Sequence, residues 1–522
     1  MKKSSLLAAL LGILIGALAV AVIGKAGARM RPVRVSQDNW QKLNLILNTV
    51  DANYVDTIDR AKVTDEAIKA ALAALDPHSS YLEPELLKDS EDDLAGNFDG
   101  IGIQFNVPND TAVVIEVIAG GPSEKIGLQA GDRILKVDDK VIAGVSFPQD
   151  SMVRRMMGPA GTKVLITVDR DGEQIPFEIT RGKIPTYSVA AAFMVNDTTG
   201  YLRLSKFART TYKEVLAKSV DLAGKGMKHM VLDLRDNSGG FLDQALLLSN
   251  LFLPKGAGIT YLEGMHRKRE EYNADGSGLL VDMPLTILID EGSASSSEIF
   301  AGAIQDNDRG TIVGRRSFGK GVVQEPTYFS DGSGIRITVA RYYTPSGRCI
   351  QKPYSDDYLY EVYERYGTGE MLDVDSIKVD KSVEYHTVGG RVVYGGGGII
   401  PDVFVPVDTT KASQFYINCN KKATAMRFAS AFFDKHRAEL SAIDDYGELI
   451  SYLDNAGLES GFLEYAGSRD GLKPIPSEWT SEKQYMMTQV YALVGRYSKL
   501  GDDAYYHLFL QTDETFKKAM EQ

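Results

Sequence analysis

The order of hydrophobic and polar positions divides the chain into regions of different character. Residues 98–182 carry short runs with alternating apolar positions, and between these runs lie the segment 120–132 and the helix-like stretch 147–158. This pattern predicts a compact β-rich module with two helices. Residues 36–75 instead have apolar positions at helical spacing, at Trp40, Leu43, Leu45, Ile46, Val50, Ala67, Ile68, Ala71, Leu72 and Leu75.

From residue 183 to 408 strand-like and helix-like runs alternate, which is typical of a layered α/β core. Within this core residues 355–398 are polar and end in four consecutive glycines, so we expect a long excursion there. After residue 410 the chain is mostly helical, at 421–440, 442–455, 482–498 and 511–521. In the core the pattern predicts strands at 200–207, 229–236, 285–291, 310–315 and 334–344, and helices at 210–224, 242–252 and 296–307.

The chain has 522 residues, which is too long for a single hydrophobic core. We expect a multi-domain α+β protein, with the β-rich module inserted next to the α/β core and with helical regions at both ends. The expected domains are a signal or anchor at 1–28, an N-terminal helical region at 29–95, the β-rich module at 96–182, the α/β core at 183–408 and a C-terminal helical region at 409–522.

The first residues have the layout of an export signal. Lys2 and Lys3 precede an apolar run at 6–23, and basic residues follow it. The run is just long enough to span a bilayer, which favours an uncleaved anchor in the inner membrane. Small residues at 19–21 and 26–28 leave cleavage open. In both cases we expect the rest of the chain outside the cytoplasm, in the periplasm or cell envelope.

Composition and charge exclude several classes. An apolar content of 44% and a charged content of 25% are ordinary for folded protein. The net charge of −12 is spread along the chain without a basic stripe, which argues against nucleic acid as a partner. The two cysteines, Cys349 and Cys419, cannot form a disulfide framework, and whether they pair with each other stays open.

The stretch FDGIGIQF (98–105) places glycines beside a strand. Such a backbone turn can bind a carboxylate, and the strand edge can pair with an extended peptide. A bulged strand is the simpler explanation of this motif alone. However, with GGPSEKIGLQAGDRILKVDDKVIAG (120–144) and the helix at 147–158, the module resembles a PDZ domain over its full length. The resemblance implies a carboxylate-binding turn and an apolar pocket for the terminal side chain, formed by Ile101, Gly102, Ile103, Val153, Met156 and Met157.

The run GSASSSEIF (292–300) is too small and polar for core material and suggests a nucleophile. A serine nucleophile needs a general base, and the histidines offer no partner motif. Lys320, between two glycines in RRSFGKGVVQ (315–324), is an alternative base. Its pKa must fall by about 3 units, or about 4 kcal/mol, which burial can supply. An isolated GKG would more simply be a surface turn.

Residues 292–324 resemble the active-site segment of the carboxy-terminal processing proteases, which are serine proteases with a Ser/Lys pair and a PDZ domain. The resemblance covers about residues 36–408. It implies that Ser295 is the nucleophile, that Lys320 is the general base and that Gln324 orients the lysine amine. Supporting segments are LDPHSSYL (75–82), GYLRLSKF (200–207), VLDLRDNSGG (231–240), ARYYTPSGRCIQ (340–351) and GIIPDVFV (398–405).

An oxyanion site is expected at DNSGG (236–240), where relatives often have proline in place of Ser238. The backbone N–H of Gly239 or Gly240 is one candidate donor, and which glycine donates stays open. The N–H of Ser296, at the start of a predicted helix, is the other. Asp233 and Asp236 also invite a metal site, but too few carboxylates are evident nearby, so we expect neither a metal nor a cofactor.

These expectations indicate an exported serine endopeptidase that cleaves polypeptides with exposed C-termini or unfolded segments. The alternative is a catalytically inactive binding scaffold with a PDZ domain. A hydrolase acting on another acyl bond is a third interpretation, which the peptide-binding module disfavours. We also expect a homo-oligomer that forms through the C-terminal helical region.

Overall fold

The structure is a computed structural model that describes residues 39–107, 110–355, 357–409 and 413–522. Its contacts divide the chain into two units, with the boundary between Ala71 and Leu72. The predicted helical stretch at 36–75 appears as α2 (Asn39–Asn53) and α3 (Arg60–Ala73). The apolar run at 6–23 lies outside the described residues. Among the helices that the structure describes, none combines the length and the apolarity that crossing a membrane requires.

The centre of the second unit is a six-stranded sheet with the order β10-β11-β12-β15-β16-β21. All neighbours from β11 to β21 are parallel, and β10 is antiparallel to β11. The inner strands are apolar almost throughout because both faces of the sheet are covered. The bounds are β10 (Val189–Met194), β11 (Thr199–Leu204), β12 (His229–Asp233), β15 (Leu285–Ile289), β16 (Thr311–Gly314) and β21 (Val403–Phe404).

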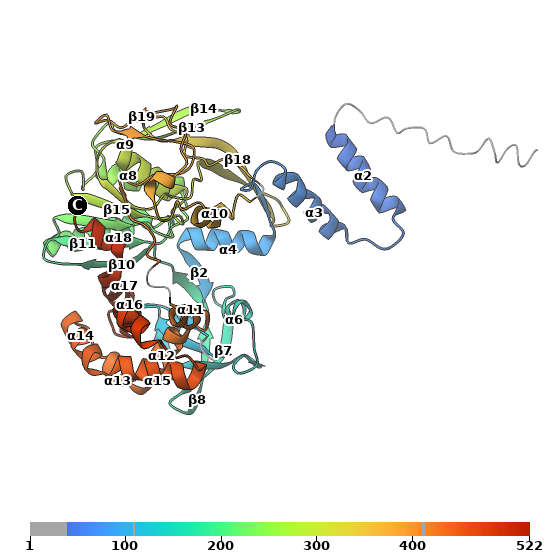
Figure 1. Ribbon diagram of the computed structural model, residues 1–522. Coiled ribbons are helices and arrows are strands. Elements are labelled where there is room, and N and C mark those ends of the chain that lie inside the picture. The colour runs from blue at the N-terminus through green and yellow to red at the C-terminus, as the bar shows by residue number, and fades with distance from the viewer. Residues whose placement is uncertain (1–38, 108–109, 356, 410–412) are drawn as a thin grey trace, which may run out of the picture. The chain divides into compact units, whose positions relative to one another are not determined.

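Helices cover both faces of this sheet (Figure 1). On one face pack α7 (Thr211–Gly224), α8 (Leu242–Phe252) and α9 (Ser296–Asp306), and their apolar side chains form the largest core cluster. The other face is covered by the last part of the chain, where Leu510 and Phe516 join a separate cluster. Alternate residues of a strand serve the two clusters, as the pleat requires: Leu232 faces the first and Val231 the second.

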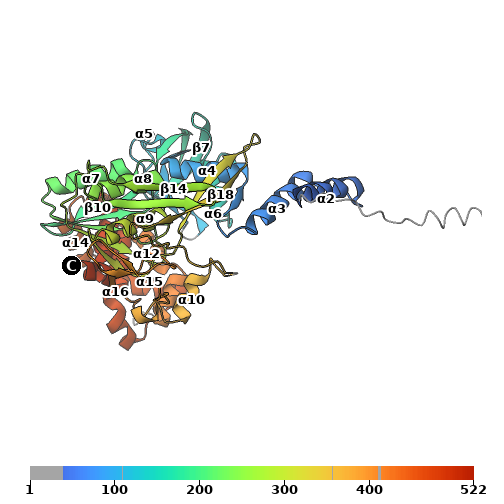
Figure 2. The same ribbon diagram turned by 90° about the horizontal axis from the view of Figure 1, so that it is seen from above.

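A second sheet lies beside this core, seen from above in Figure 2, and its longest strand is β18 (Gly334–Tyr343). β18 pairs with β1 (Ser80–Leu82) and with β17 (Val322–Tyr328). Residues 75–79, which precede β1, therefore lie near β17, which directly follows the FGKG motif (318–321). The sheet continues from β18 to β13 (Gly258–Gly264) and β14 (Arg267–Asn273). We did not predict β13, β14 or β17 from the sequence.

The β-rich module contains a sheet with the order β3-β4-β5-β7-β8, with β6 paired to β5. Its core includes Ile134, Val164 and Met152. β2 (Asn97–Gly100) and β9 (Gly182–Pro185) pair at the two ends of the module, which follows α4 (Pro84–Ala95). The other elements are β3 (Ile103–Asn106), β4 (Ala112–Val117), α5 (Pro122–Lys125), β5 (Arg133–Val137), β6 (Lys140–Val141), α6 (Gln149–Met156), β7 (Lys163–Arg170) and β8 (Glu173–Thr180).

The expected excursion at 355–398 has structure of its own and buries several polar residues, including Arg365 and Glu370. It contains α10 (Glu361–Gly367), a 3-10 helix η2 (Val374–Ser376), β19 (Tyr385–His386) and β20 (Val392–Val393). The polar composition therefore reflects buried ion pairs as well as solvent exposure.

The C-terminal region is helical as predicted and forms its own apolar cluster around Phe433, Leu453 and Phe462. Its last helices belong in addition to the core, because they cover one face of the six-stranded sheet. The structure confirms the multi-domain α+β class, whereas the predicted boundary at 409 stays a prediction. The helices are α11 (Gln414–Lys421), α12 (Thr424–Lys435), α13 (Arg437–Leu440), α14 (Tyr446–Asn455), α15 (Leu458–Asp470), α16 (Pro476–Gly495), α17 (Gly501–Phe509), η3 (Leu510–Thr512) and α18 (Glu514–Ala519).

Candidate active site

Three loops meet at one edge of the six-stranded sheet. They follow β12, β15 and β16, which are neighbouring parallel strands, so their carboxyl ends lie side by side. We call them the glycine turn (234–241), the serine turn (290–296) and the lysine loop (315–321). The sheet order thus brings together the motifs DNSGG, GSAS and FGKG.

Ser295 lies where the serine turn enters α9, and its backbone is strained. Its φ of 55° and ψ of −114° are unusual for a residue with a side chain. Such a conformation costs on the order of 1–3 kcal/mol, and it persists only where the surroundings impose it. A strained serine between a strand and a helix is the arrangement that exposes a nucleophilic hydroxyl in other hydrolases.

The four serines between positions 293 and 297 have different environments. Ser293, Ser296 and Ser297 are buried, and each donates its hydroxyl hydrogen to a carbonyl of the glycine turn. The Ser295 side chain is half-buried, and within the described part of the chain its hydroxyl donates to no protein group. Three serines therefore connect the serine turn and the start of α9 to the glycine turn through hydrogen bonds. The hydroxyl oxygen of Ser293 lies 2.8 Å from Leu234 O, that of Ser296 lies 3.0 Å from Gly240 O, and that of Ser297 lies 2.8 Å from Asn237 O.

Glu298 joins the serine turn to the lysine loop. Its carboxylate is fully buried, and one oxygen accepts from the N–H of Ser295 at 2.8 Å and from the N–H of Lys320 at 2.9 Å. The other oxygen accepts from the hydroxyl of Ser317 at 2.5 Å and from the N–H of Gly319 at 2.7 Å. Burial raises the pKa of Glu298, while these hydrogen bonds favour its charged form.

Tyr342 makes a second connection between the same two segments. Its ring is buried on β18, and its hydroxyl contacts the carbonyl oxygens of Lys320 and of Ser295, the latter at 3.2 Å. The backbone positions of the serine and the lysine are thus coupled through two side chains. We did not identify either side chain from the sequence, although the spacing of Ser295 and Glu298 is that of a capping box.

The Lys320 side chain is half-buried, and its amine donates to Gln324 Oε1 at 3.0 Å. Burial and the positive charge of Arg336 lower the pKa of the amine, against the opposing effect of Glu298 and Asp76. Within the described residues no hydrogen bond joins the amine to the Ser295 hydroxyl. The structure therefore places Gln324 beside the amine and holds the serine on a neighbouring loop.

His78 fixes the orientation of Gln324. The Gln324 amide nitrogen donates to the carbonyl of His78, which leaves the amide oxygen for the lysine amine. The imidazole of His78 contacts the Tyr358 hydroxyl at 2.8 Å, and burial together with Lys320 lowers its pKa to about 4. The ring is therefore neutral above that pH.

In the glycine turn, Gly239 and Gly240 have positive φ of 97° and 148°. A Cβ at Gly239 would lie 2.8 Å from the Ser295 Cβ, so the turn approaches the serine too closely for a side chain. The N–H of Gly239 already donates to Asn237 Oδ1 at 2.9 Å. The N–H groups of Gly240 and Ser296 have no protein acceptor in the described part of the chain, which favours Gly240 over Gly239 as a donor.

The predicted peptide-binding residues lie in two parts of the β-rich module. Gly102, with φ of 79°, precedes the edge strand β3, which begins at Ile103, and Ile101 is buried beside it. The three predicted pocket residues at the end of α6 differ in burial, and their role in the pocket stays a prediction. Val153 and Met157 are half-buried, whereas Met156 is buried in the core of the module beside Met152, because residues four apart share one helix face.

The aspartates considered for a metal have other partners. The buried Asp233 carboxylate accepts from the Tyr201 hydroxyl at 2.7 Å and forms ion pairs with Arg203 and Arg235. Asp236 is exposed. Cys349 and Cys419 are both free thiols.

Comparisons with known proteins agree with this architecture. The peptidase family S41 model matches residues 198–358, and the PDZ domain model matches residues 100–180. A carboxy-terminal-processing protease of Bartonella bacilliformis is 39% identical over 310 residues, which cover 59% of this chain and 71% of the relative. The carboxy-terminal processing protease CtpA of Bacillus subtilis is 33% identical over 60% of this chain and 67% of the relative.

Among solved structures, a photosystem II D1 C-terminal processing protease is 27% identical and covers 71% of this chain and 87% of that chain, with a TM-score of 0.37. The PDZ match confirms the predicted type of the β-rich module. The two bacterial relatives are 39% and 33% identical over 71% and 67% of their lengths. This chain therefore belongs to the carboxy-terminal processing proteases, the serine proteases of peptidase family S41.

Proposed function

We propose that this protein is a serine endopeptidase that uses Ser295 as nucleophile and Lys320 as general base. The observation that carries the proposal is the strained Ser295 backbone, which shares the buried Glu298 carboxylate with the backbone of Lys320. A lysine amine can act as a base near neutral pH when its pKa is lowered, and burial acts in that direction here.

The reaction has two stages. The Lys320 amine leaves Gln324 and takes the proton of the Ser295 hydroxyl as the oxygen attacks a peptide carbonyl. The resulting ammonium gives the proton to the leaving amine, and an acyl-enzyme remains on Ser295. Water then attacks the acyl-enzyme with Lys320 again as base, which releases the second product and restores the serine.

The negative charge of the tetrahedral intermediate needs donors that are already in place. The N–H groups of Gly240 and Ser296 are proposed for this role, because neither has a competing acceptor among the described residues. Ser296 is in addition the first residue of α9, where the helix dipole stabilises an anion.

The PDZ domain is proposed to bind the C-terminus of the polypeptide substrate. β3 pairs only with β4 among the described strands, so its other edge can accept an added strand, as extended peptides do elsewhere. The turn at Ile101, Gly102 and Ile103 is proposed to bind the terminal carboxylate. Val153 on α6 and Met157 directly after it are half-buried, and together with the buried Met156 they are proposed to offer apolar surface for the last side chain.

We propose export to the periplasm or cell envelope from the basic and apolar pattern of the first residues, with residues 6–23 as an inner-membrane anchor if they are not cleaved. Association of two or more copies through the C-terminal helical region is also proposed. Velocity sedimentation tests this second point, and a single species of monomer mass at micromolar concentration would contradict it.

The enzyme and scaffold functions are distinguished by one assay. Unfolded casein is incubated with the purified full chain and with its Ser295→Ala and Lys320→Ala variants. We expect cleavage by the parent and none by either variant. Equal cleavage by all three would exclude the Ser/Lys assignment, and no cleavage by the parent under any condition would favour the scaffold.

Peptide capture is tested by titrating peptides that end in alanine or valine, each as the free acid and as the amide. We expect the free acids to bind more tightly by tenfold or more, because the amide cannot supply the carboxylate. Equal affinity for the two forms would contradict the proposed turn.

A further inference from the structure

The lysine loop presents three successive carbonyl groups to one buried side chain. The guanidinium of Arg365 on α10 donates to the carbonyl oxygen of Arg316 at 3.1 Å, to that of Ser317 at 3.0 Å and to that of Phe318 at 3.1 Å. Arg365 is only 2% exposed. A planar guanidinium with five N–H donors suits such a set of acceptors, whereas a lysine ammonium does not reproduce its geometry.

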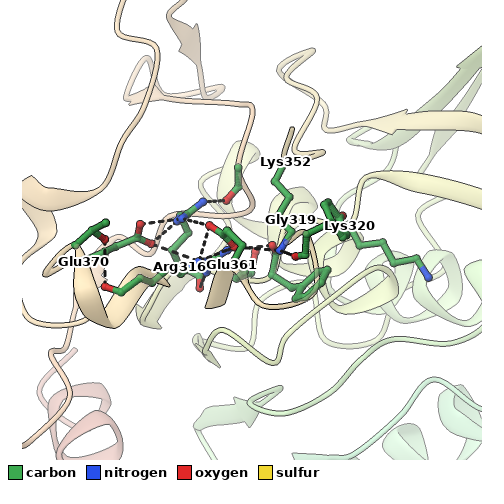
Figure 3. Close-up of polar contacts among 12 residues, drawn as sticks. Arg316, Gly319, Lys320, Lys352, Glu361 and Glu370 are labelled. Atoms are coloured by element: carbon green, nitrogen blue, oxygen red, sulfur yellow. Dashed lines mark hydrogen bonds and ion pairs between the residues drawn. The ribbon is translucent and has the colours of Figure 1, made fainter. Parts of the chain in front are cut away.

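The positive charge of Arg365 is balanced within the same segment. Its Nε donates to both oxygens of Glu361, each at 3.1 Å. Glu361 also pairs with Lys352 at 3.0 Å and with Arg316 at 3.1 Å, and Arg316 forms a two-point contact with Glu370 (Figure 3). The side chains of these five residues thus connect α10 and its flanks to the lysine loop.

Glu298 holds the opposite side of the same loop. Its carboxylate accepts from the N–H groups of Gly319 and Lys320 and from the Ser317 hydroxyl, while Arg365 takes the carbonyls of the three residues before them. These N–H and O–H groups of the lysine loop therefore donate to the buried carboxylate of Glu298, and the three carbonyl groups accept from the buried guanidinium of Arg365. In Figure 3 the Lys320 side chain extends away from the ion-pair network, so its backbone is fixed while its amine remains outside the network.

A loop held in this way has little freedom at the lysine backbone. An unsatisfied buried carbonyl costs on the order of 1–3 kcal/mol, so without the guanidinium the loop would have to turn three carbonyls to other donors. Such a turn would carry Lys320 with it. Small misplacements of a catalytic group, of about 1 Å, cost on the order of 100-fold in rate.

We propose that Arg365 is a positioning residue for Lys320, and that the segment 352–370 acts as a clamp on the lysine loop. This inference rests on the proposed Ser/Lys mechanism and extends it to Arg365, which lies beyond residue 358, where the match to the family model ends. Arg365 acts through the backbone of the loop and contacts neither the substrate nor the reacting atoms.

The test compares Arg365→Gln and Arg365→Lys with Arg427→Gln in the full chain. Arg427 is a matched control, because it is partly buried and forms a two-point ion pair with Asp470 in the C-terminal helical region. For each variant kcat and KM are measured on a peptide substrate at a temperature where urea denaturation shows the protein to be fully folded. The rate at which a fluorophosphonate labels Ser295 is measured on the same samples.

We expect Arg365→Gln to lower kcat and the labelling rate by about 100-fold while KM changes by less than threefold. Arg365→Lys keeps the positive charge without the planar set of donors, so it should recover less than tenfold of that loss, and Arg427→Gln should keep the parental values. If folded Arg365→Gln keeps parental kcat and labelling, the clamp is wrong. The proposed mechanism would be at fault instead if Ser295→Ala or Lys320→Ala retained activity.

Discussion

Replacement of Glu298 by glutamine tests the connection between the serine turn and the lysine loop. The carboxylate accepts four hydrogen bonds, two at each oxygen. A glutamine amide has one acceptor atom, so its nitrogen must face one of the two pairs. The pair formed by Ser317 and Gly319 is the less costly choice, because the Ser317 hydroxyl can rotate to become an acceptor.

The expected magnitude follows from this arrangement. The N–H of Gly319 is left without an acceptor, which costs about 1–3 kcal/mol. The bonds from the N–H groups of Ser295 and Lys320 lose their charged acceptor, at about 1 kcal/mol each. Because the neutral side chain also avoids the cost of burying a charge, we expect a net loss of about 2–4 kcal/mol in the free energy of unfolding.

The activity of Glu298→Gln should fall even in protein that remains fully folded. The strained φ of Ser295 is maintained in part by the hydrogen bond from its N–H to Glu298, and relaxation of that strain would move the hydroxyl. We expect kcat on a peptide substrate to fall by about 100-fold in fully folded protein.

The assay combines urea denaturation with steady-state kinetics. Glu325→Gln is the matched control, since Glu325 lies on exposed surface and pairs with Arg267, an interaction worth about 0–1 kcal/mol. If Glu298→Gln kept both the stability and the kcat of the parent, the idea that this carboxylate holds the two loops in register would be refuted.

Three further predictions concern the glycine turn, the lysine pKa and the last helix. Gly239→Ala would place a methyl group 2.7 Å from the carbonyl oxygen of Ala294 and impose a positive φ on alanine. Casein cleavage should therefore be lost. Cleavage at the parental rate would show that the glycine turn can move away from the serine turn. Arg336→Met removes a positive charge that lowers the pKa of Lys320, so the pKa of Lys320 should rise. The ascending limb of the plot of kcat/KM against pH should then move to higher pH. If this limb did not move, Lys320 would be excluded as the group whose titration it reports. Asp513→Ala removes one of the two carboxylates that pair with the buried Arg235, which keeps Asp233, so the free energy of unfolding should fall by about 1.5–3 kcal/mol in urea. A loss under about 1 kcal/mol would mean that this ion pair contributes little to stability.

Local periodicity predicted the core elements with small errors at their ends. The helix predicted at 242–252 coincides with α8, and the strand predicted at 229–236 contains β12. In contrast, β14 (RKREEYN) has no apolar alternation because it lies at the exposed edge of its sheet, so its pattern does not distinguish a strand from a loop.

The candidate site was predictable where its residues belong to short motifs. Ser295, Lys320 and Gln324 lie in such motifs, and the order of β12, β15 and β16 in the sheet brings the loops together. Arg365 was not predictable, because its partners lie 47–49 positions away and its surroundings are polar in sequence. The burial of Met156 beside Met152 was also not predictable, because helical periodicity alone does not tell which face of α6 meets the core.

The central claim is that Ser295 is activated by the amine of Lys320. Intact-mass analysis and peptide mapping after reaction with a fluorophosphonate test it most directly. We predict one adduct per chain, located on Ser295, which disappears in Ser295→Ala and forms at least 100-fold more slowly in folded Lys320→Ala. Labelling of another residue, or labelling of Ser295 at the parental rate without Lys320, would contradict the account.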